Sequence, residues 1–162
     1  MRKVSILFFL SATLCFFSCS KKDSGCSYQD DNIVAPVSEQ KLVKDYLDSI
    51  GVTATLAPSG FYYVIINQGT GAKPGLCSSI SVNYKGVLVD GTVFDQQYNF
   101  VYTLGSLIDG WKKGLPLINN GGEIKLYIPP TLGYGTKAVS TGSVEIPANS
   151  ILIFDITLLN VQ

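Results

Sequence analysis

Residues 81–95 read SVNYKGVLVDGTVFD, and this stretch predicts a β-hairpin. Apolar residues alternate with polar ones before the turn signal Asp90-Gly91, and an apolar run resumes after it. Phe94 and Asp95 then place an aromatic ring and a carboxylate next to each other just beyond the turn. An apolar wall with one hydrogen-bonding group is typical of a pocket for a small apolar substrate.

Composition narrows the chemistry that the chain can perform. Its 162 residues suggest one domain plus extensions. Twelve basic and twelve acidic residues cancel, which leaves no electrostatic basis for binding nucleic acid. Sixteen glycines and a charged fraction of 15% favour a turn-rich β protein over a helical bundle. Histidine is absent, which excludes Ser-His and Cys-His catalysis and the usual zinc sites, so we expect neither a metal nor a cofactor.

Residues 1–18 are predicted to be a signal peptide. Arg2-Lys3 precede an apolar run, residues 4–17, that is too short for a comfortable membrane span. Cys19 follows the small Ser18, which resembles the lipobox of bacterial lipoproteins, although the usual Leu is missing before it. The resemblance implies lipidation of Cys19 and a membrane-anchored location in the bacterial cell envelope, on the periplasmic or surface face of the outer membrane. An ordinary secretory signal is the alternative.

Residues 19–37 have the composition of a flexible tether, with Lys, Asp, Ser and Gly and few apolar residues. The tether contains Cys26, and one further cysteine follows, Cys77. Outside the cytoplasm these two can form a disulfide that ties the tether to the domain. Two unpaired thiols are the alternative, because a sequence does not supply the distance between the two residues.

A helix is predicted from Ser38 to about Ile50, followed by a linker up to residue 59. Ser38 is the candidate N-cap, apolar residues recur with a helical period, and Gly51 is a C-terminal signal. The apolar stripe comprises Leu42, Val43, Tyr46, Leu47 and Ile50. It can pack on the domain or on a second copy of the chain, and the sequence leaves both open.

From residue 60 to residue 162 the pattern predicts a single α+β domain. Strands are expected at residues 61–66, 80–89, 92–95, 100–104, 123–128 and 151–159. A short helix is expected at residues 107–115, ended by Pro116, and a long loop at residues 131–149. Together they give a twisted antiparallel β-sheet with one short helix to cover its concave face.

Six motifs downstream of the hairpin occur in an informative order and spacing. They are Leu104-Gly105, Leu107-Ile108-Asp109-Gly110-Trp111, Ile128-Pro129-Pro130, Leu132-Gly133-Tyr134-Gly135, Ile146-Pro147 and Leu152-Ile153-Phe154-Asp155-Ile156. The set resembles the FKBP family of peptidyl-prolyl cis-trans isomerases over residues 60–161. It also resembles bacterial lipoproteins that carry such a domain behind a tether and a short helix.

The resemblance implies a half-barrel of strands wrapped around the short helix, with a pocket between helix and sheet. The catalytic residues it implies are Tyr84, Phe94, Asp95, Ile108, Trp111, Tyr134 and Phe154. The further substrate-binding residues it implies are Phe100, Leu107 and Ile146.

Individual roles follow from the same resemblance. Trp111 is expected to form the pocket floor beneath the substrate proline ring. The Ile108 backbone N–H and the Tyr134 hydroxyl are expected to donate hydrogen bonds to the substrate, and Asp95 to accept one at the rim. Asn83 stands where many members have histidine, and the loop at residues 135–146 is longer than in the smallest members, which puts substrate preference and affinity for macrolide inhibitors in doubt.

The implied activity is rotation about Xaa–Pro bonds in exported proteins, with proline-containing polypeptides as partners. Such rotation needs no nucleophile and no metal, only a site that favours the twisted amide over the planar one. The alternative from another class is a non-catalytic module that binds unfolded or proline-containing segments. A carrier of a small apolar ligand would need a closed barrel, and the expected strands are too few for one.

Overall fold

The hairpin predicted at residues 81–95 forms, and it is built from the strands β3 (Ser79–Val87) and β4 (Val93–Thr103). Its turn closes where expected: Gly91 has φ of 87°, and the Leu88 N–H donates to the Thr92 carbonyl at 2.9 Å. Glycine suits this position because the left-handed region carries no steric cost for it.

Strand β4 is longer than the sequence predicts. The expected separate strand at residues 100–104 is wrong, because residues 100–103 continue β4 and Leu104 begins a 3-10 turn. A shift in the pairing with β3 lies between Val82 and Tyr84, and Asn99 has φ of 52°. Such a bulge breaks the alternation of side chains along a strand, so the polar residues 96–99 look like a loop in the sequence.

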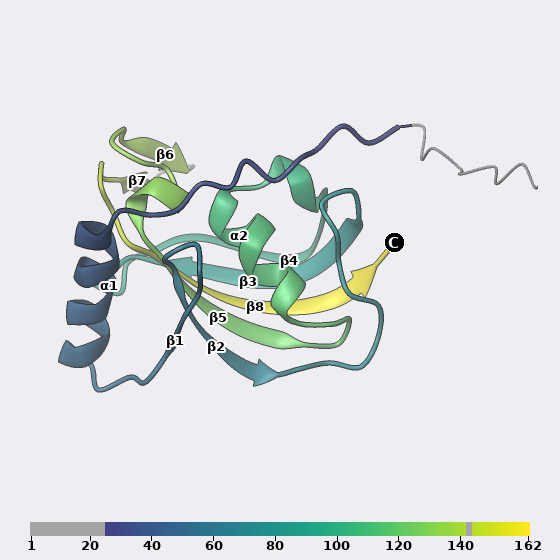
Figure 1. The fold of residues 1–162 in the computed structure, drawn as a ribbon, viewed down its shortest axis with the longest axis horizontal. Coiled ribbons are helices and arrows are strands. Elements are labelled where there is room, and N and C mark those ends of the chain that lie inside the picture. Colours follow the sequence, from purple (N-terminus) through teal and green to yellow (C-terminus); the bar gives the residue numbers. More distant parts are fainter. Residues whose placement is uncertain (1–24, 142–143) are drawn as a thin grey trace, which may run out of the picture.

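The structure is a computed structural model that describes residues 25–141 and 144–162, so the expected signal peptide and Cys19 lie outside the described residues. Six strands form one antiparallel sheet in the order β1-β2-β5-β8-β3-β4 (Figure 1). The remaining four of these are β1 (Thr55–Leu56), β2 (Tyr62–Asn67), β5 (Glu123–Ile128) and β8 (Leu152–Val161). The expected α+β class and antiparallel sheet are confirmed.

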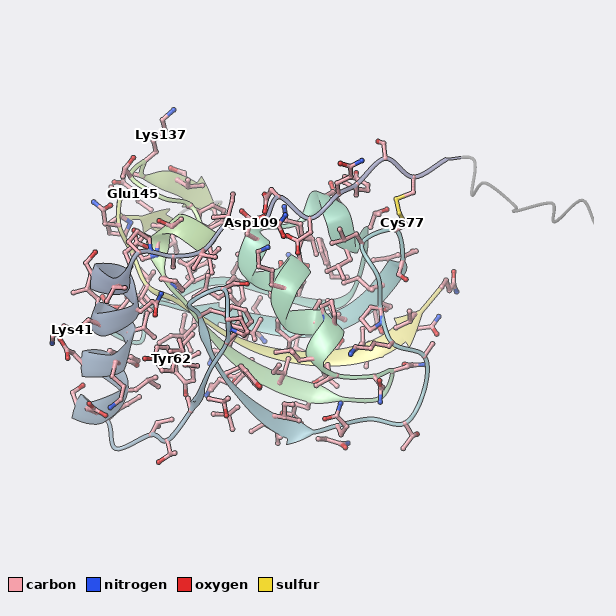
Figure 2. The ribbon with its side chains drawn as sticks, viewed as in Figure 1. Lys41, Tyr62, Cys77, Asp109, Lys137 and Glu145 are labelled. Atoms are coloured by element: carbon pink, nitrogen blue, oxygen red, sulfur yellow. A yellow bond between two sulfur atoms is a disulfide. The ribbon has the colours of Figure 1, made fainter. Side chains whose placement is uncertain are left out.

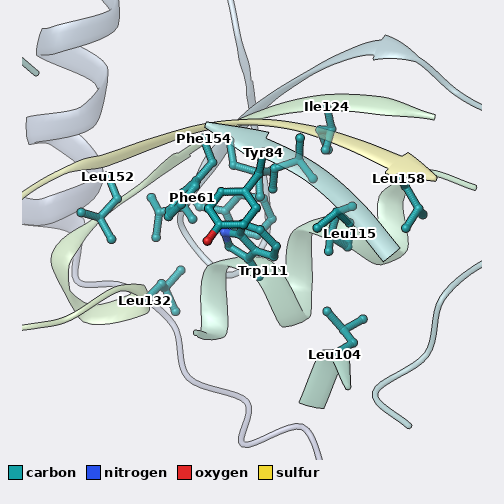
Figure 3. Close-up of a cluster of buried hydrophobic side chains, with 14 of the residues drawn as sticks. Phe61, Tyr84, Leu104, Trp111, Leu115, Ile124, Leu132, Leu152, Phe154 and Leu158 are labelled. Atoms are coloured by element: carbon teal, nitrogen blue, oxygen red, sulfur yellow. The ribbon is translucent and has the colours of Figure 1, made fainter. Parts of the chain in front are cut away.

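One face of the sheet is packed against the short helix α2 (Asp109–Gly114) (Figures 1 and 3). Alternate residues of β5 and β8 point to this face, as expected, and all are at most 3% exposed: Ile124, Leu126, Ile128, Leu152, Phe154, Ile156 and Leu158. Alternation in a strand sends every second side chain to the same face, so these two strands form a continuous apolar floor under α2.

The region around α2 differs in detail from the expected helix at residues 107–115. A 3-10 turn (Leu104–Ser106) comes first, and Leu107 and Ile108 are extended before α2 begins. A second 3-10 turn (Leu115–Leu117) follows α2 directly and contains Pro116. Proline is tolerated there because the first turn of a helix needs no N–H donor, so Pro116 does not end the helical segment.

The opposite face of the sheet carries the helix α1 (Val37–Ser49). Val43 and Leu47 of α1 pack with Tyr62, Tyr127 and Ile153, which come from β2, β5 and β8. The buried stripe is therefore narrower than the sequence suggests, and two expected members of it are exposed, Leu42 and Ile50. Of the two alternatives left open by the sequence, packing on the domain is the one that Val43 and Leu47 adopt.

The N-terminal end of α1 differs from the prediction, whereas its C-terminal end agrees with it. Ser38 is not the N-cap, because Pro36 holds that position and Ser38 lies in the first turn. Gly51 ends the helix as predicted, with φ of 66° and its N–H donating to the Asp48 carbonyl at 3.2 Å. The Val52 N–H donates to the Leu47 carbonyl at 3.0 Å, which completes a Schellman motif.

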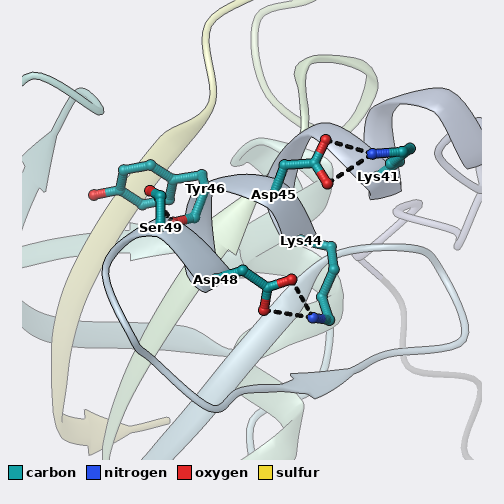
Figure 4. A network of polar contacts seen from close by, with 6 residues as sticks. All are labelled: Lys41, Lys44, Asp45, Tyr46, Asp48 and Ser49. Carbon is teal, nitrogen blue, oxygen red and sulfur yellow. Dashed lines mark hydrogen bonds and ion pairs between the residues drawn. The ribbon is translucent and has the colours of Figure 1, made fainter.

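The exposed face of α1 carries two ion pairs one turn apart (Figure 4). Lys41 Nζ lies 2.6 Å from Asp45 Oδ2. Lys44 Nζ lies 2.5 Å from Asp48 Oδ1. Pairs this exposed contribute little to the stability of the chain, because water screens their charges. The attachment of α1 to the sheet therefore depends on its buried residues.

Residues 131–149 are more regular than the expected loop. A 3-10 turn (Pro130–Leu132) is followed by β6 (Val139–Thr141) and β7 (Val144–Ile146), which pair with each other. Thr141 Oγ1 donates to the Phe94 carbonyl at 2.7 Å, so this small hairpin lies against the start of β4. Strands of three residues are too short to produce a periodic pattern, which explains why the sequence does not reveal them.

Residues 25–36, which we call the strap, run along the outer side of α2 (Figure 1). Composition predicts a flexible tether here, whereas the strap makes several contacts with the domain. Cys26 forms a disulfide with Cys77, with 5.7 Å between the Cα atoms (Figure 2). Asp30 pairs with Lys113, whose side chain is 8% exposed. Among the described residues, no helix has the length and apolar character needed to cross a membrane.

We expect Gly86→Ala to destabilise the chain by about 1–3 kcal/mol, because it overpacks a filled core. A Cβ at Gly86 would lie 2.6 Å from Phe94 Cζ and 2.9 Å from Phe154 Cε1. Urea denaturation measures the change. Gly75→Ala is the control, since a Cβ there meets nothing within 4 Å. Equal stability of the two variants would contradict the packing described above.

Removing the disulfide with Cys26→Ser/Cys77→Ser should lower the free energy of unfolding by about 2–4 kcal/mol, because the bridge closes a long loop. The two cysteines are 51 residues apart in sequence. Thermal unfolding with and without dithiothreitol measures the effect. If dithiothreitol lowers the unfolding temperature of the double variant as much as that of the parent chain, the loss of stability in reductant does not come from the disulfide.

Candidate active site

A pocket of about 160 Å³ lies between α2 and the concave face of the sheet. It is lined by eight residues from β3, β4, α2 and its preceding turn, the loop after residue 132, and β8: Tyr84, Asp95, Phe100, Leu107, Ile108, Trp111, Tyr134 and Phe154. All eight belong to the set that the sequence predicts. The tertiary structure brings them together from positions up to 70 residues apart, counted from Tyr84 to Phe154.

Trp111 is the centre of this arrangement (Figure 3). Its ring stands edge to face against Tyr84, with 5.0 Å between centroids, and against Phe154, with 5.2 Å. Edge-to-face packing is the preferred geometry of aromatic pairs and contributes about 0.5–1.5 kcal/mol beyond burial alone. Trp111 is 4% exposed, so the small part of its ring that remains open is the part at the pocket.

The wall at β3 and β4 combines an aromatic ring with a carboxylate. The Tyr84 hydroxyl donates to Asp95 Oδ2 at 2.6 Å across the two paired strands. Burial raises the pKa of Tyr84 well above its usual range, and the hydrogen bond to Asp95 raises it further. Tyr84 therefore stays protonated and keeps donating to Asp95 at every physiological pH.

Three donors on pocket residues have no hydrogen-bond acceptor in the described part of the chain. They are the Ile108 backbone N–H, the Trp111 Nε1–H and the Tyr134 hydroxyl. Burial raises the pKa of Tyr134, so its hydroxyl also remains a donor. Of the three, the Trp111 Nε1–H is fully buried. A buried donor without a partner costs about 1–3 kcal/mol, and such groups are characteristic of places where a ligand supplies the acceptor.

Two predicted residues lie beside the pocket but do not line it. Phe94 is 4% exposed and packs edge to face on Phe154 at 5.4 Å, and Ile146 is fully buried. Both belong to the core cluster that supports the pocket wall. The rings of Phe94 and Phe154 both pack against Gly86, where a side chain would collide with them.

Sequence reasoning missed a contact from α1 to the loop that carries Tyr134. Glu39 Oε2 accepts from the Thr131 N–H and Glu39 Oε1 accepts from the Thr131 hydroxyl, both at 2.8 Å. Thr131 lies in the 3-10 turn Pro130–Leu132, three residues before Tyr134, so the carboxylate holds the turn that leads into that loop. The two residues are 92 positions apart, and no local pattern could have paired them.

The groups that line the pocket offer non-covalent contacts to a ligand. Within residues 25–141 and 144–162 no group of acidic or sulfur ligands could hold a metal ion. The pocket offers aromatic walls, unpartnered donors and one carboxylate that is already hydrogen-bonded. Such a site can bind an apolar ring and orient neighbouring carbonyl groups.

The chain was compared with known proteins. A family model described as FKBP-type peptidyl-prolyl cis-trans isomerase matches residues 71–159. The FKBP-type peptidyl-prolyl cis-trans isomerase FkpA of Buchnera aphidicola (subsp. Schizaphis graminum) is 43% identical over 125 residues, covering 74% of this chain and 47% of that protein. The outer membrane protein MIP of Legionella longbeachae is 38% identical over 109 residues, covering 65% and 46%. The chain thus spans less than half the length of these relatives.

Solved structures are also similar. The crystal structure of FkpA from Escherichia coli superposes with a TM-score of 0.68 and 35% identity, covering 78% of this chain and 60% of that one. The peptidyl-prolyl cis-trans isomerase of Pseudomonas syringae pv. tomato gives 0.66 and 28%, covering 79% and 97%.

Tyr84→Phe should destabilise the chain by about 1 kcal/mol near neutral pH, since Asp95 loses its donor. The loss should shrink at high pH. Above pH ~10 the folded chain keeps the Tyr84 proton while the unfolded chain releases it, so Tyr84 makes stability fall by at most about 1.4 kcal/mol per pH unit. Urea denaturation at about pH 8 and about pH 11 measures the gap between parent and variant.

Tyr46→Phe is the control for this comparison, because the Tyr46 hydroxyl makes no hydrogen bond to another described residue. If the difference in free energy of unfolding between the parent and Tyr84→Phe stays constant or grows from pH ~8 to pH ~11, the folded chain does not retain the Tyr84 proton above its usual pKa.

Proposed function

Because the chain belongs to the family of FKBP-type peptidyl-prolyl cis-trans isomerases, we propose that it catalyses rotation about Xaa–Pro bonds in polypeptides. The observation that carries the proposal is the pocket itself, a Trp111 floor between two aromatic walls with unpartnered donors at its edge. Its volume of about 160 Å³ resembles that of an apolar cavity known to admit benzene, so a proline ring fits.

The mechanism follows from the chemistry of the amide. Rotation about Xaa–Pro faces a barrier of about 18–20 kcal/mol, because the planar bond is conjugated. The twisted amide has lost conjugation and part of the charge separation of its carbonyl, so an apolar pocket stabilises it relative to the planar form. A rate increase of about a thousandfold requires only about 4 kcal/mol of such differential binding.

Each pocket residue has a role in this proposal. Trp111 holds the proline ring, with Tyr84 and Phe154 keeping the indole in place. The Ile108 N–H and the Tyr134 hydroxyl donate to carbonyl groups of the substrate backbone and fix its position. Asp95 holds the Tyr84 ring through their hydrogen bond. Phe100 and Leu107 close the sides against water, and Phe94 and Ile146 support the walls from the core.

We propose that the clients are exported proteins and that the chain works in the cell envelope. Support comes from the predicted signal peptide at residues 1–18, the disulfide at Cys26, and a relative whose name is outer membrane protein MIP. Lipidation at Cys19 would anchor the domain to the membrane. The same pocket would accept macrolide inhibitors, which compete for the proline site.

Turnover of short Xaa–Pro peptides tests this function. The parent chain should accelerate isomerisation, and rapamycin should inhibit it. Tyr134→Phe should lower kcat/KM by about fivefold, the equivalent of one net hydrogen bond of about 1 kcal/mol. Asp95→Val should lower it at least as much, since it also releases Tyr84.

Tyr46→Phe is the matched control, because Tyr46 belongs to α1 and packs on the face of the sheet opposite the pocket. Its kcat/KM should equal that of the parent. A folded parent chain that does not accelerate isomerisation would refute the proposed function. Full activity in both pocket variants would instead refute the roles given to Tyr134 and Asp95.

A further inference from the structure

Strand β4 is the outermost strand of the six-stranded sheet, so in the described part of the chain one of its edges has no neighbouring strand. Proteins usually protect such edges with charged residues or proline, because an open edge pairs with other chains. The only charged residue of β4 is Asp95, and it is hydrogen-bonded to Tyr84. The β6–β7 hairpin lies against the start of the strand, where Thr141 donates to the Phe94 carbonyl.

Large apolar side chains are exposed along this unprotected strand. Tyr98 is 69% exposed, Val101 is 60% and Tyr102 is 50%. Single exposed apolar residues are common, but several on one edge strand indicate a surface that contacts another molecule.

A groove of about 450 Å³ lies at the end of this strand, and we call it the edge groove. Its lining is uncharged: Tyr28, Ser79, Val101, Tyr102, Thr103 and Ser106. Half of the lining residues carry a small hydroxyl side chain, and the two tyrosines and the valine supply the contacts for an apolar or aromatic side chain. No lining residue could pair with a charged one.

The strap supplies one wall of the edge groove and is fixed in place there. Tyr28 lies so close over Gly105 that a Cβ on Gly105 would be 2.6 Å from the Tyr28 Cβ. The disulfide from Cys26 to Cys77 holds the strap two residues earlier. The groove is therefore bounded on one side by the sheet and on the other by a covalently tethered segment.

The edge groove and the candidate active site are separate hollows whose linings meet at one pair of stacked rings. The Phe100 ring, which lines the pocket, stacks on the Tyr102 ring, which lines the groove, with 5.3 Å between centroids and 3° between planes. These residues are two positions apart on β4, and an extended chain advances about 3.3 Å per residue. A polypeptide with its proline in the pocket therefore reaches the groove within about two to four residues.

We propose that the edge groove binds an apolar side chain of the substrate polypeptide, two to four residues away from the proline held in the pocket. The occupant is an extended segment that runs beside the free edge of β4, a recognised mode of peptide binding. This inference rests on the proposed function and adds to it a preference for apolar residues in the flanking segment of the substrate.

The test compares two dodecapeptides with one central Xaa–Pro bond, one with leucine at the second to fourth positions on both sides and one with serine there. With the full chain, kcat/KM should be at least fivefold higher for the leucine peptide. In Tyr28→Ser/Val101→Ser this ratio should fall to near one, since both changed residues line the groove. Ile66→Ser is the matched control, an exposed apolar residue on β2 that should keep the parent ratio.

A short tetrapeptide separates this inference from the proposed function. If the parent chain turns over the tetrapeptide but shows no preference for leucine, the edge groove is not a substrate site. The same conclusion follows if the double variant still prefers the leucine dodecapeptide over the serine one. It also follows if kcat/KM of the double variant falls by the same factor for the tetrapeptide as for the leucine dodecapeptide. If the parent does not turn over the tetrapeptide at all, the proposed function itself fails.

Discussion

The edge-to-face contact of Trp111 with Tyr84 and Phe154 supports both the core and the pocket. Helix α2 has only six residues, too few to be stable alone in water. Its place on the sheet depends on burying Trp111 and on the small Gly110 and Gly114, where a Cβ would lie within 2.8 Å of Ile128 or Leu126 side-chain atoms. The close approach of the helix to the sheet leaves a shallow pocket with Trp111 as its floor, so the packing that stabilises the domain also defines the site.

Two additions outside the sheet and helix strengthen this arrangement. The strap runs along the outer side of α2 and pairs its carboxylates with lysines of that helix, while α1 covers the opposite face of the sheet. Glu39 of α1 reaches Thr131 and so connects the distant helix to the loop that carries Tyr134. Elements that look like a tether and an accessory helix in the sequence therefore contribute to the geometry of the site.

The proposed chemistry requires no group in the pocket to change its protonation. The chain has no histidine, and the two pocket tyrosines have raised pKa values, so neither changes its protonation near neutral pH. Catalysis by differential binding of a twisted amide needs shape, low polarity and fixed donors, and those depend on packing. The structure supplies them from five different segments of the chain.

Much of this was readable from the sequence. The turn at Asp90-Gly91, the stop of α1 at Gly51, and the inward faces of β5 and β8 follow from local rules of turn chemistry and period. The eight lining residues came from a family resemblance, which carries tertiary information that local patterns lack. Only the tertiary structure decided several other features. They are the bulge in β4, the β6–β7 hairpin, the exposure of Leu42, the hydrogen bonds of Glu39 to Thr131, and the burial of Phe94 in the core. The β6–β7 hairpin is a local pairing whose strands are too short to leave a periodic pattern. The others depend on contacts between residues distant in the chain, and the free energy of such contacts is set by which neighbours the complete fold brings within reach.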